Sequence, residues 1–135
     1  MERSIAVIVA THGTLGEALV ATAEHILGEP AGLLPFVFAA EDDPQTASRK
    51  LQTVIKRADQ GRGVVILVDL FGGTPGSLAL SLLEEEQVEV VTGVNLPMAV
   101  AAASLDPALD LAAAAAMLME SGQNGIKDAG LLLKS

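Results

Sequence analysis

The chain has 135 residues, half of them apolar, and eight basic against seventeen acidic side chains give it a formal net charge of −9. This length is typical of a single domain, expected over residues 1–135, and the negative charge argues against nucleic acid or an anionic membrane as a partner. Without cysteine there is no disulfide framework or thiolate metal site, and with only two, widely separated histidines we expect no metal and no cofactor.

The N-terminal apolar run ends after six residues at the polar Thr11-His12 pair, which is shorter than the apolar segment of an export signal. The Ala-rich segment 97–119 is interrupted by Ser104, Asp106, Pro107 and Asp110, so it does not read as a membrane span. We therefore expect a cytoplasmic protein with no direct membrane insertion.

The first elements along the chain are a strand and a helix. Residues 5–10 form a continuous aliphatic run, which predicts a strand buried on both faces. Thr14 and Glu17 make a Thr-x-x-Glu capping box, so a helix is predicted to begin there and to end at Gly28. Four residues at helical spacing are expected to share one face of it: Leu15, Leu19, Thr22 and Ile26.

The same alternation continues through the middle of the chain. Residues 33–39 predict a second strand, and Asp43 followed by Pro44 predicts the start of a second helix. Its apolar stripe is formed by Ala47, Leu51, Val54, Ile55 and Ala58. Residues 63–69 predict a third strand, and Thr74-Pro75 begins a helix that reaches the acidic cluster 84–86.

Residues 88–92 predict a fourth strand, and the turn at 95–97 leads into a short helix. Asp106 followed by Pro107 is expected to begin a further helix and Gly122 to end it, leaving an apolar tail with Ile126 and residues 131–133. Four buried strands joined by helices predict an α/β fold: an open parallel four-stranded sheet, order 2-1-3-4, with helices on both faces.

His12 follows the first predicted strand, and Asp69 stands at the end of the third. In the order 2-1-3-4 these strands are neighbours at the switch point of the sheet, where ligands of such folds bind. A carboxylate that accepts a hydrogen bond from one ring nitrogen fixes the imidazole tautomer and leaves the other nitrogen free as a nucleophile or base. The sequence therefore predicts that Asp69 orients His12 in one crevice.

Glycines and helix starts surround the same edge of the sheet. Gly13, Gly72 and Gly73 let the backbone approach an anion closely, and the helix starts at Thr14 and Thr74 offer unpaired amides and positive dipole ends. We expect an anionic group on or near His12.

These residues also have purely structural interpretations. A histidine after a strand is more often a hydrogen-bonded structural residue, Asp69 and Thr74 can cap the following turn and helix, and Gly72-Gly73 can form a tight loop. His25 is expected only to complement the dipole at its helix end. The acidic runs 41–43 and 84–86 are interpreted as solvated surface rather than metal sites.

Four stretches of the chain, residues 7–13, 23–28, 67–75 and 91–98, together span most of it. In sequence and order they resemble the IIA component of the mannose-type (mannose/fructose/sorbose) family of the bacterial phosphotransferase system. The Thr-His-Gly motif and the Asp-x-x-Gly-Gly-Thr-Pro motif are the most specific pair.

The resemblance implies a phosphotransferase component without a cofactor, whose His12 accepts a phosphoryl group from HPr as a tele-phosphohistidine and passes it to a IIB component. It assigns to Asp69 the orientation of His12, and to Thr74, together with the loop amides of Gly13, Gly72 and Gly73, the binding of the phosphoryl group. It also implies a homodimer in which a fifth, C-terminal strand is exchanged, for which the apolar tail and the Ala-rich helical segment provide surface.

Two features depart from the family pattern or remain open. At Gly76-Ser77 many relatives carry a larger or amide residue, which leaves the details of HPr docking there undecided. Because the sequence stops after one domain, we expect any IIB component to be a separate polypeptide. The alternatives are a regulatory phosphocarrier without a permease, the phosphotransfer subunit of a dihydroxyacetone kinase, and a flavodoxin-like anion-binding module. A hydrolase lacks a second base, metal or nucleophile.

Overall fold

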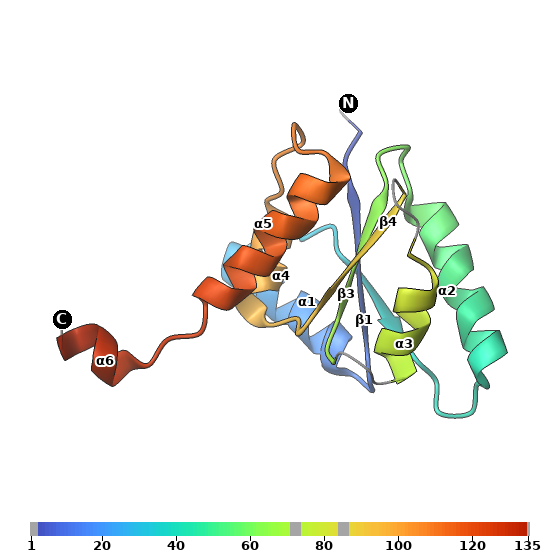
Figure 1. Cartoon of the computed structure of the whole chain (residues 1–135), viewed down its shortest axis with the longest axis horizontal. Coiled ribbons are helices and arrows are strands. Elements are labelled where there is room, and N and C mark those ends of the chain that lie inside the picture. The colour runs from blue at the N-terminus through green and yellow to red at the C-terminus, as the bar shows by residue number, and fades with distance from the viewer. Residues whose placement is uncertain (1–2, 71–73, 84–86, 135) are drawn as a thin grey trace.

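Four strands form one sheet with helices on both faces (Figure 1). The computed structural model describes residues 3–70, 74–83 and 87–134. In chain order its elements are β1 (Ala6–Thr11), α1 (Leu15–Leu27), β2 (Leu34–Val37), α2 (Pro44–Ala58), β3 (Val64–Val68), α3 (Thr74–Ser81), β4 (Val88–Thr92), α4 (Leu96–Ala103), α5 (Leu111–Asn124) and α6 (Ala129–Lys134). None of the helices in these ranges is long and apolar enough to cross a membrane.

The sheet has the predicted order β2-β1-β3-β4, and every strand pair is parallel. Ala10 of β1 lies opposite Val68, the last residue of β3, and β1 ends one residue later at Thr11. Both strands are buried along their whole length, which explains their unbroken aliphatic sequences. The residues that follow β1 and β3 therefore emerge side by side at the carboxyl edge of the sheet.

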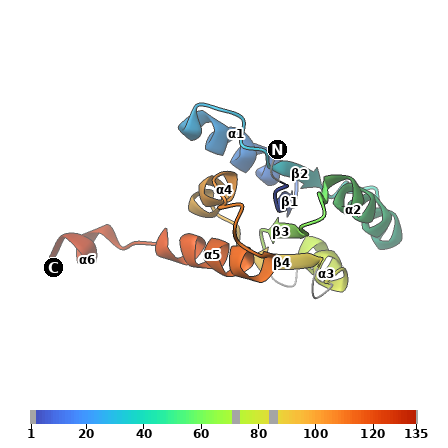
Figure 2. The same ribbon diagram turned by 90° about the horizontal axis from the view of Figure 1, so that it is seen from above.

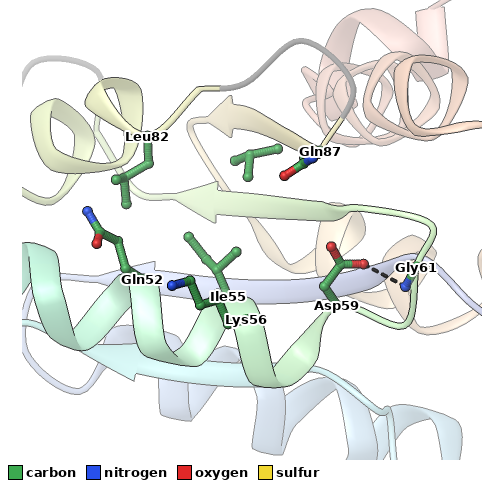
Figure 3. Close-up of a pocket in the computed structure, with 8 residues that line it drawn as sticks. Gln52, Ile55, Lys56, Asp59, Gly61, Leu82 and Gln87 are labelled. Atoms are coloured by element: carbon green, nitrogen blue, oxygen red, sulfur yellow. Dashed lines mark hydrogen bonds between the residues drawn. The ribbon is translucent and has the colours of Figure 1, made fainter.

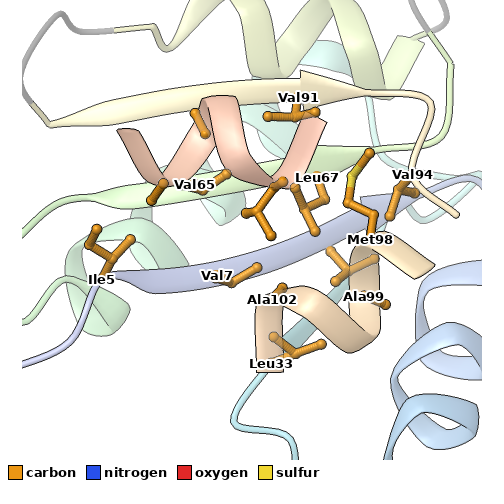
Figure 4. Packing of buried hydrophobic residues seen from close by; sticks show 14 of the residues in the cluster. Ile5, Val7, Leu33, Val65, Leu67, Val91, Val94, Met98, Ala99 and Ala102 are labelled. Atoms are coloured by element: carbon orange, nitrogen blue, oxygen red, sulfur yellow. The ribbon is translucent and has the colours of Figure 1, made fainter. Parts of the chain in front are cut away.

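Helices α1, α4 and α5 cover one face of the sheet, and α2 and α3 cover the other (Figure 2). Because side chains alternate along a strand, Val7 and Val9 join the core under α1, α4 and α5, whereas Ile8 and Ala10 join the core under α2 and α3. Figure 4 shows the first of these cores, where Met98 and Ala99 of α4 face the strands. The side chains are almost all aliphatic, as the composition requires.

The capping box predicted for the start of α1, with Thr14 as the capping residue, is wrong. Thr14 occupies the N-cap position but makes no cap hydrogen bond through its side chain. The N–H of Gly16 donates instead to Thr11 Oγ1, at 2.6 Å. The last strand residue thus satisfies an amide in the first turn of α1, because the helix starts close enough to the strand for Thr11 to reach it.

The buried face of α1 also differs from the predicted one. Gly16, Val20 and Ala23 face the core, whereas Leu15 and Ile26 are 44% and 55% exposed. A Cβ atom on Gly16 would lie 2.9 Å from the carbonyl oxygen of Val9. The small residues Gly16 and Ala23 are therefore turned to the sheet with Val20, and Leu19 of the predicted face is partly buried against the same core. The predicted end is confirmed, since Gly28 adopts a left-handed conformation and its N–H donates to Glu24 O.

The predictions for α2 and α3 agree better with the structure. Asp43 caps α2 by accepting the N–H of Thr46 at 2.7 Å, and Pro44 is the first helical residue. Helix α3 begins at Thr74 as predicted and ends at Ser81. The acidic cluster 84–86, to which it was expected to extend, lies outside the described residues.

The start predicted for α5 at Asp106-Pro107 is wrong, because residues 106–109 form a turn. The guanidinium of Arg62 donates to the carbonyl oxygens of Pro107 and Leu109, the latter at 2.7 Å. These carbonyls are thereby held away from helical geometry. The helix begins only after Asp110, whose carboxylate accepts the N–H of Ala113 at 2.8 Å.

Gly122 does not end α5, which continues to Asn124. A Cβ atom on Gly122 would lie 2.6 Å from Cε of Met98 in α4, and the side-chain amide of Asn95 donates to the Gly122 carbonyl at 3.0 Å. The glycine therefore serves the close packing of α4 against α5 instead of terminating the helix.

The predicted C-terminal strand is absent from the described chain, in which residues 129–134 form α6. This helix projects away from the body of the molecule (Figure 1), and Leu131, Leu132 and Leu133 are exposed. A strand requires a neighbouring strand for its backbone hydrogen bonds, whereas a helix satisfies them locally. The N–H groups of Leu131 and Leu132 bond to the Asp128 side chain and backbone, so a single chain can form the helix alone.

We predict that Thr14→Ala changes the free energy of unfolding by less than about 0.5 kcal/mol, because the exposed Thr14 side chain makes no cap bond. Asp110→Ala should cost about 1 kcal/mol, since it removes the bond to the N–H of Ala113. Urea unfolding of both variants tests this difference. Equal destabilisation at the two positions would show that Thr14 caps α1 after all.

Candidate functional site

His12 and Asp69 meet where β1 and β3 end. The distance from His12 Nδ1 to Asp69 Oδ2 is 2.9 Å, and the backbone N–H of His12 donates to the same oxygen at 3.2 Å. The other carboxylate oxygen, Oδ1, accepts the N–H of Leu70 at 3.1 Å. One aspartate therefore holds both the backbone and the ring of His12, and its own orientation is fixed by the turn that follows β3.

The charge state of Asp69 decides which nitrogen of His12 is free. Partial burial raises the pKa of Asp69. Hydrogen bonds from the ring and backbone of His12, together with the electrostatic attraction of that ring, lower the pKa by more than burial raises it. The pKa of Asp69 therefore lies below its ordinary value of 3.8. The ionised carboxylate can only accept. Nδ1 therefore carries a proton, so in the neutral imidazole the lone pair lies on Nε2.

The lowered pKa of Asp69 also fixes how this interaction depends on pH. The ionised carboxylate stabilises the fold at pH values above 3.8, and this contribution is lost as the pH falls through the lowered pKa. Asp69 is 11% exposed, whereas the His12 side chain is 49% exposed. The ring of His12 is thus open to a reactant in solution, while the carboxylate that holds it is largely buried.

A pocket of about 490 Å³ lies beside His12. Its wall comes from the loop after β2 and the first residues of α2, with the lining formed by His12, Gly13, Phe38, Ala39, Ala40, Asp42, Pro44 and Ala47. The charge of Asp42 is paired with Lys50 Nζ at 2.6 Å. Sequence reasoning missed this wall, although the parallel order offered a signal: the loop after β2 leaves the sheet at the same edge as His12.

The structure describes only part of the predicted anion-binding set. Gly13 adjoins His12 with φ of +53°, a conformation that favours glycine, and lines the pocket. Thr74 is the first residue of α3, which follows β3 at the same edge. Gly72 and Gly73 lie outside the described residues. Gly76 and Ser77, at which the sequence analysis expected a departure from the family pattern, lie in α3, and Ser77 is exposed.

Two other predicted or visible features lie away from this edge. His25 is exposed in the last turn of α1, as expected for a residue that complements the helix dipole. A second pocket, of about 590 Å³, is lined by Gln52 and Lys56 of α2, by Gly61 before β3 and by Gln87 before β4 (Figure 3). Because these last two residues precede their strands, this pocket lies at the opposite end of the sheet from His12.

A family model described as "PTS system fructose IIA component", EIIA-man, matches residues 6–119. The mannose-specific EIIAB component of the phosphotransferase system of Escherichia coli (strain K12) is 35% identical over 128 residues, which cover 92% of this chain and 39% of that protein. The fructose-specific EIIA component of Bacillus subtilis (strain 168) is 35% identical over 102 residues, or 75% of this chain and 70% of that protein.

Solved structures agree with these matches. The mannose/sorbose specific IIA subunit of the phosphotransferase system from Enterococcus faecalis superimposes with a TM-score of 0.82 and 32% identity, covering 93% of this chain and 94% of that one. The chain spans about two fifths of the length of the Escherichia coli relative, but most of the length of the Bacillus and Enterococcus proteins. The resemblance in the motifs is confirmed: the chain belongs to the EIIA-man family of IIA components of the phosphotransferase system.

Proposed function

We propose that His12 is the residue on which this phosphocarrier holds its phosphoryl group, as a tele-phosphohistidine. The observation that carries the proposal is the 2.9 Å bond between His12 Nδ1 and Asp69. It commits the proton to Nδ1 and leaves Nε2, on a half-exposed ring, as the nucleophile. Asp69 is the orienting residue, because it also accepts the backbone N–H of His12.

In the proposed reaction the Nε2 lone pair attacks phosphorus in line. An N–P bond to His12 forms while the N–P bond to the donor's histidine breaks, and the electron pair leaves with the donor's nitrogen. The ring of His12 gains positive charge, which the ionised Asp69 stabilises through Nδ1–H. Catalysis is then mostly positioning and charge stabilisation, and no residue needs to act as a general base.

We assign the binding of the phosphoryl oxygens to the amides around His12 and to the start of α3. Gly13 supports this because its position is open and its backbone can approach an anion closely. The first turn of α3, with Thr74 and the preceding Gly72 and Gly73, would add a positive dipole end and a hydroxyl group.

HPr is the proposed donor and a IIB component the proposed acceptor, both acting in the cytoplasm. A protein that reaches His12 must cover the adjacent pocket and two exposed leucines next to the site. Leu15 donates its N–H to the His12 carbonyl and is 44% exposed, and Leu70 follows Asp69 and is 57% exposed. Such apolar groups can anchor a partner, and the net charge of −9 suits a donor with a basic rim.

We further propose a homodimer in which the tail of one chain adds a strand to β4 of a second copy. Among the described residues β4 pairs only with β3, so its outer edge has free backbone groups. An open, mainly apolar groove runs beside it, with Val90, Ala112, Ala116 and Met119 in its lining. Because α6 has only six residues and is marginal as a helix, its conversion to a strand costs little.

Incubation with phosphoenolpyruvate, enzyme I and HPr should add one phosphoryl group per chain. The linkage should be labile in acid and stable in base, as a phosphoramidate is. His12→Ala should abolish the reaction, and His25→Ala, the matched control in the last turn of α1, should leave it nearly unchanged. Mass spectrometry and peptide mapping test this, and a group found on His25 or on a serine would refute the assignment.

Asp69→Asn should slow phosphoryl transfer more than it destabilises the fold. The amide can donate to the ring and so favour the wrong tautomer or rotamer. Removing a charge-assisted bond to the reacting ring should cost about 1.5–3 kcal/mol, or roughly tenfold to a hundredfold in rate. Single-turnover transfer from phospho-HPr, measured beside urea unfolding, decides the matter. Normal transfer with normal stability would mean that another group orients His12.

Deletion of the residues after Gly125 should weaken the proposed dimer, because it removes the segment that would pair with β4. Sedimentation equilibrium should give twice the chain mass for the full chain and a larger dissociation constant for the truncated one. A full-length chain that is monomeric, or a dimer whose dissociation constant does not change on truncation, would rule out strand exchange.

A further inference from the structure

We propose that Thr11 is a positioning residue for His12: its buried hydroxyl ties the first turn of α1 to the end of β1 and thereby fixes the turn that carries the histidine. The proposal rests on the assignment of His12 as phosphoryl carrier. Thr11 itself touches no reacting atom.

The contact between Thr11 and α1 is short and closed to solvent. Thr11 is 0% exposed, and its Oγ1 accepts the N–H of Gly16 at 2.6 Å. Gly16 makes this approach possible, because a Cβ atom at that position would lie 3.0 Å from Thr11 Oγ1 and 2.9 Å from the carbonyl oxygen of Val9. Thr11 and Gly16 therefore complement each other. The missing side chain of Gly16 lets α1 approach β1, and the Thr11 hydroxyl accepts the hydrogen bond of the Gly16 N–H.

His12, the residue after Thr11, faces the opposite way from the Thr11 side chain. Val9 lies in the core under α1, so Thr11, two residues further along the strand, has its side chain on the same side and reaches Gly16. His12 lies towards α2, where it lines a pocket with Ala47. The turn from β1 into α1 is thus held at two points, by Asp69 through His12 and by Gly16 through Thr11.

Few other contacts hold this turn. The N–H of Leu15 donates to the His12 carbonyl at 3.4 Å, which is long for a hydrogen bond. Thr14 contributes no cap bond, and Gly13 has a positive φ and no side chain to restrict it. Among the described residues, loss of the Thr11 hydroxyl would leave that long bond as the remaining hydrogen bond between the start of α1 and the end of β1. The His12 backbone would then be held by its N–H to Asp69 without support from the helix side.

Phosphoryl transfer is sensitive to such a loss, because displacements of about 1 Å from in-line geometry can reduce rates by up to about a hundredfold. Thr11→Val keeps the shape of the side chain but removes the acceptor, which leaves the buried N–H of Gly16 unpaired. Thr11→Ser keeps the hydroxyl. Asp110→Ala removes a comparable cap bond at the start of α5, which follows the turn held by Arg62, and serves as the matched control for lost stability.

The experiment measures three quantities for the wild type and these variants: single-turnover transfer from phospho-HPr, urea unfolding, and the ¹⁵N NMR resonances of the His12 ring. At equal folded fraction, Thr11→Val should transfer about tenfold more slowly and shift the Nδ1 resonance. Thr11→Ser and Asp110→Ala should retain the wild-type rate and ring resonances. Gly16→Ala, which forces the helix away from Thr11 without substituting His12, Asp69 or Thr11, should repeat the loss and serves if Thr11→Val does not fold.

Wild-type transfer rates and ring resonances in folded Thr11→Val or folded Gly16→Ala would overturn the proposal and leave Thr11 as a structural cap only. A wild-type chain that is not phosphorylated on His12 would instead refute the proposed function. The two failures are therefore distinguishable, since the first is measured between variants of a chain that has already been shown to carry phosphate on His12.

Discussion

The parallel pairing of β1 with β3 is the constraint on which the site depends. Ala10 lies opposite Val68, so the segments that follow β1 and β3 leave the sheet side by side. His12 Nδ1 thereby lies 2.9 Å from Asp69 Oδ2. A slip of one residue would turn every side chain of β1 to the other face of the sheet. Because both strands are buried on both faces, the register is held by the two cores, and the geometry of the site is a consequence of how the sheet is packed.

Because side chains alternate along β1, its last residue, Thr11, and the following His12 lie in different surroundings. Thr11 is buried under α1 and His12 is half exposed on the other side. A reactive imidazole must be accessible, and an accessible side chain at a strand end has few neighbours to restrain it. Here the restraint comes from an ionised aspartate on the ring and from a buried hydroxyl in the backbone turn.

Close packing between elements explains three of the glycines that the structure describes. Gly16 lets α1 approach β1, and Gly122 lets α5 approach Met98 of α4. Gly63 has a φ of +90°, and a Cβ atom there would lie 2.9 Å from Leu111 Cδ2. With few large aromatic side chains available, the chain gains packing by bringing its elements close together, and the leucines beside His12 and in the tail are left exposed.

The sequence by itself determined the features that depend on neighbours along the chain or on regular periodicity. The apolar runs identified the four strands and their order in the sheet, although only β1 and β3 are buried throughout and β2 is mostly exposed. Asp43 and Gly28 marked helix ends, and the two motifs indicated His12, Asp69 and the family. Only the tertiary structure decided which hydroxyl caps α1, because that depends on the distance between a strand end and a helix start. The same holds for the start of α5, where Arg62 binds carbonyl groups 45 and 47 residues away. The conformation of the C-terminal tail also depends on which backbone groups are available to pair with it. In a single chain the backbone groups of the tail pair with one another, within the short helix α6.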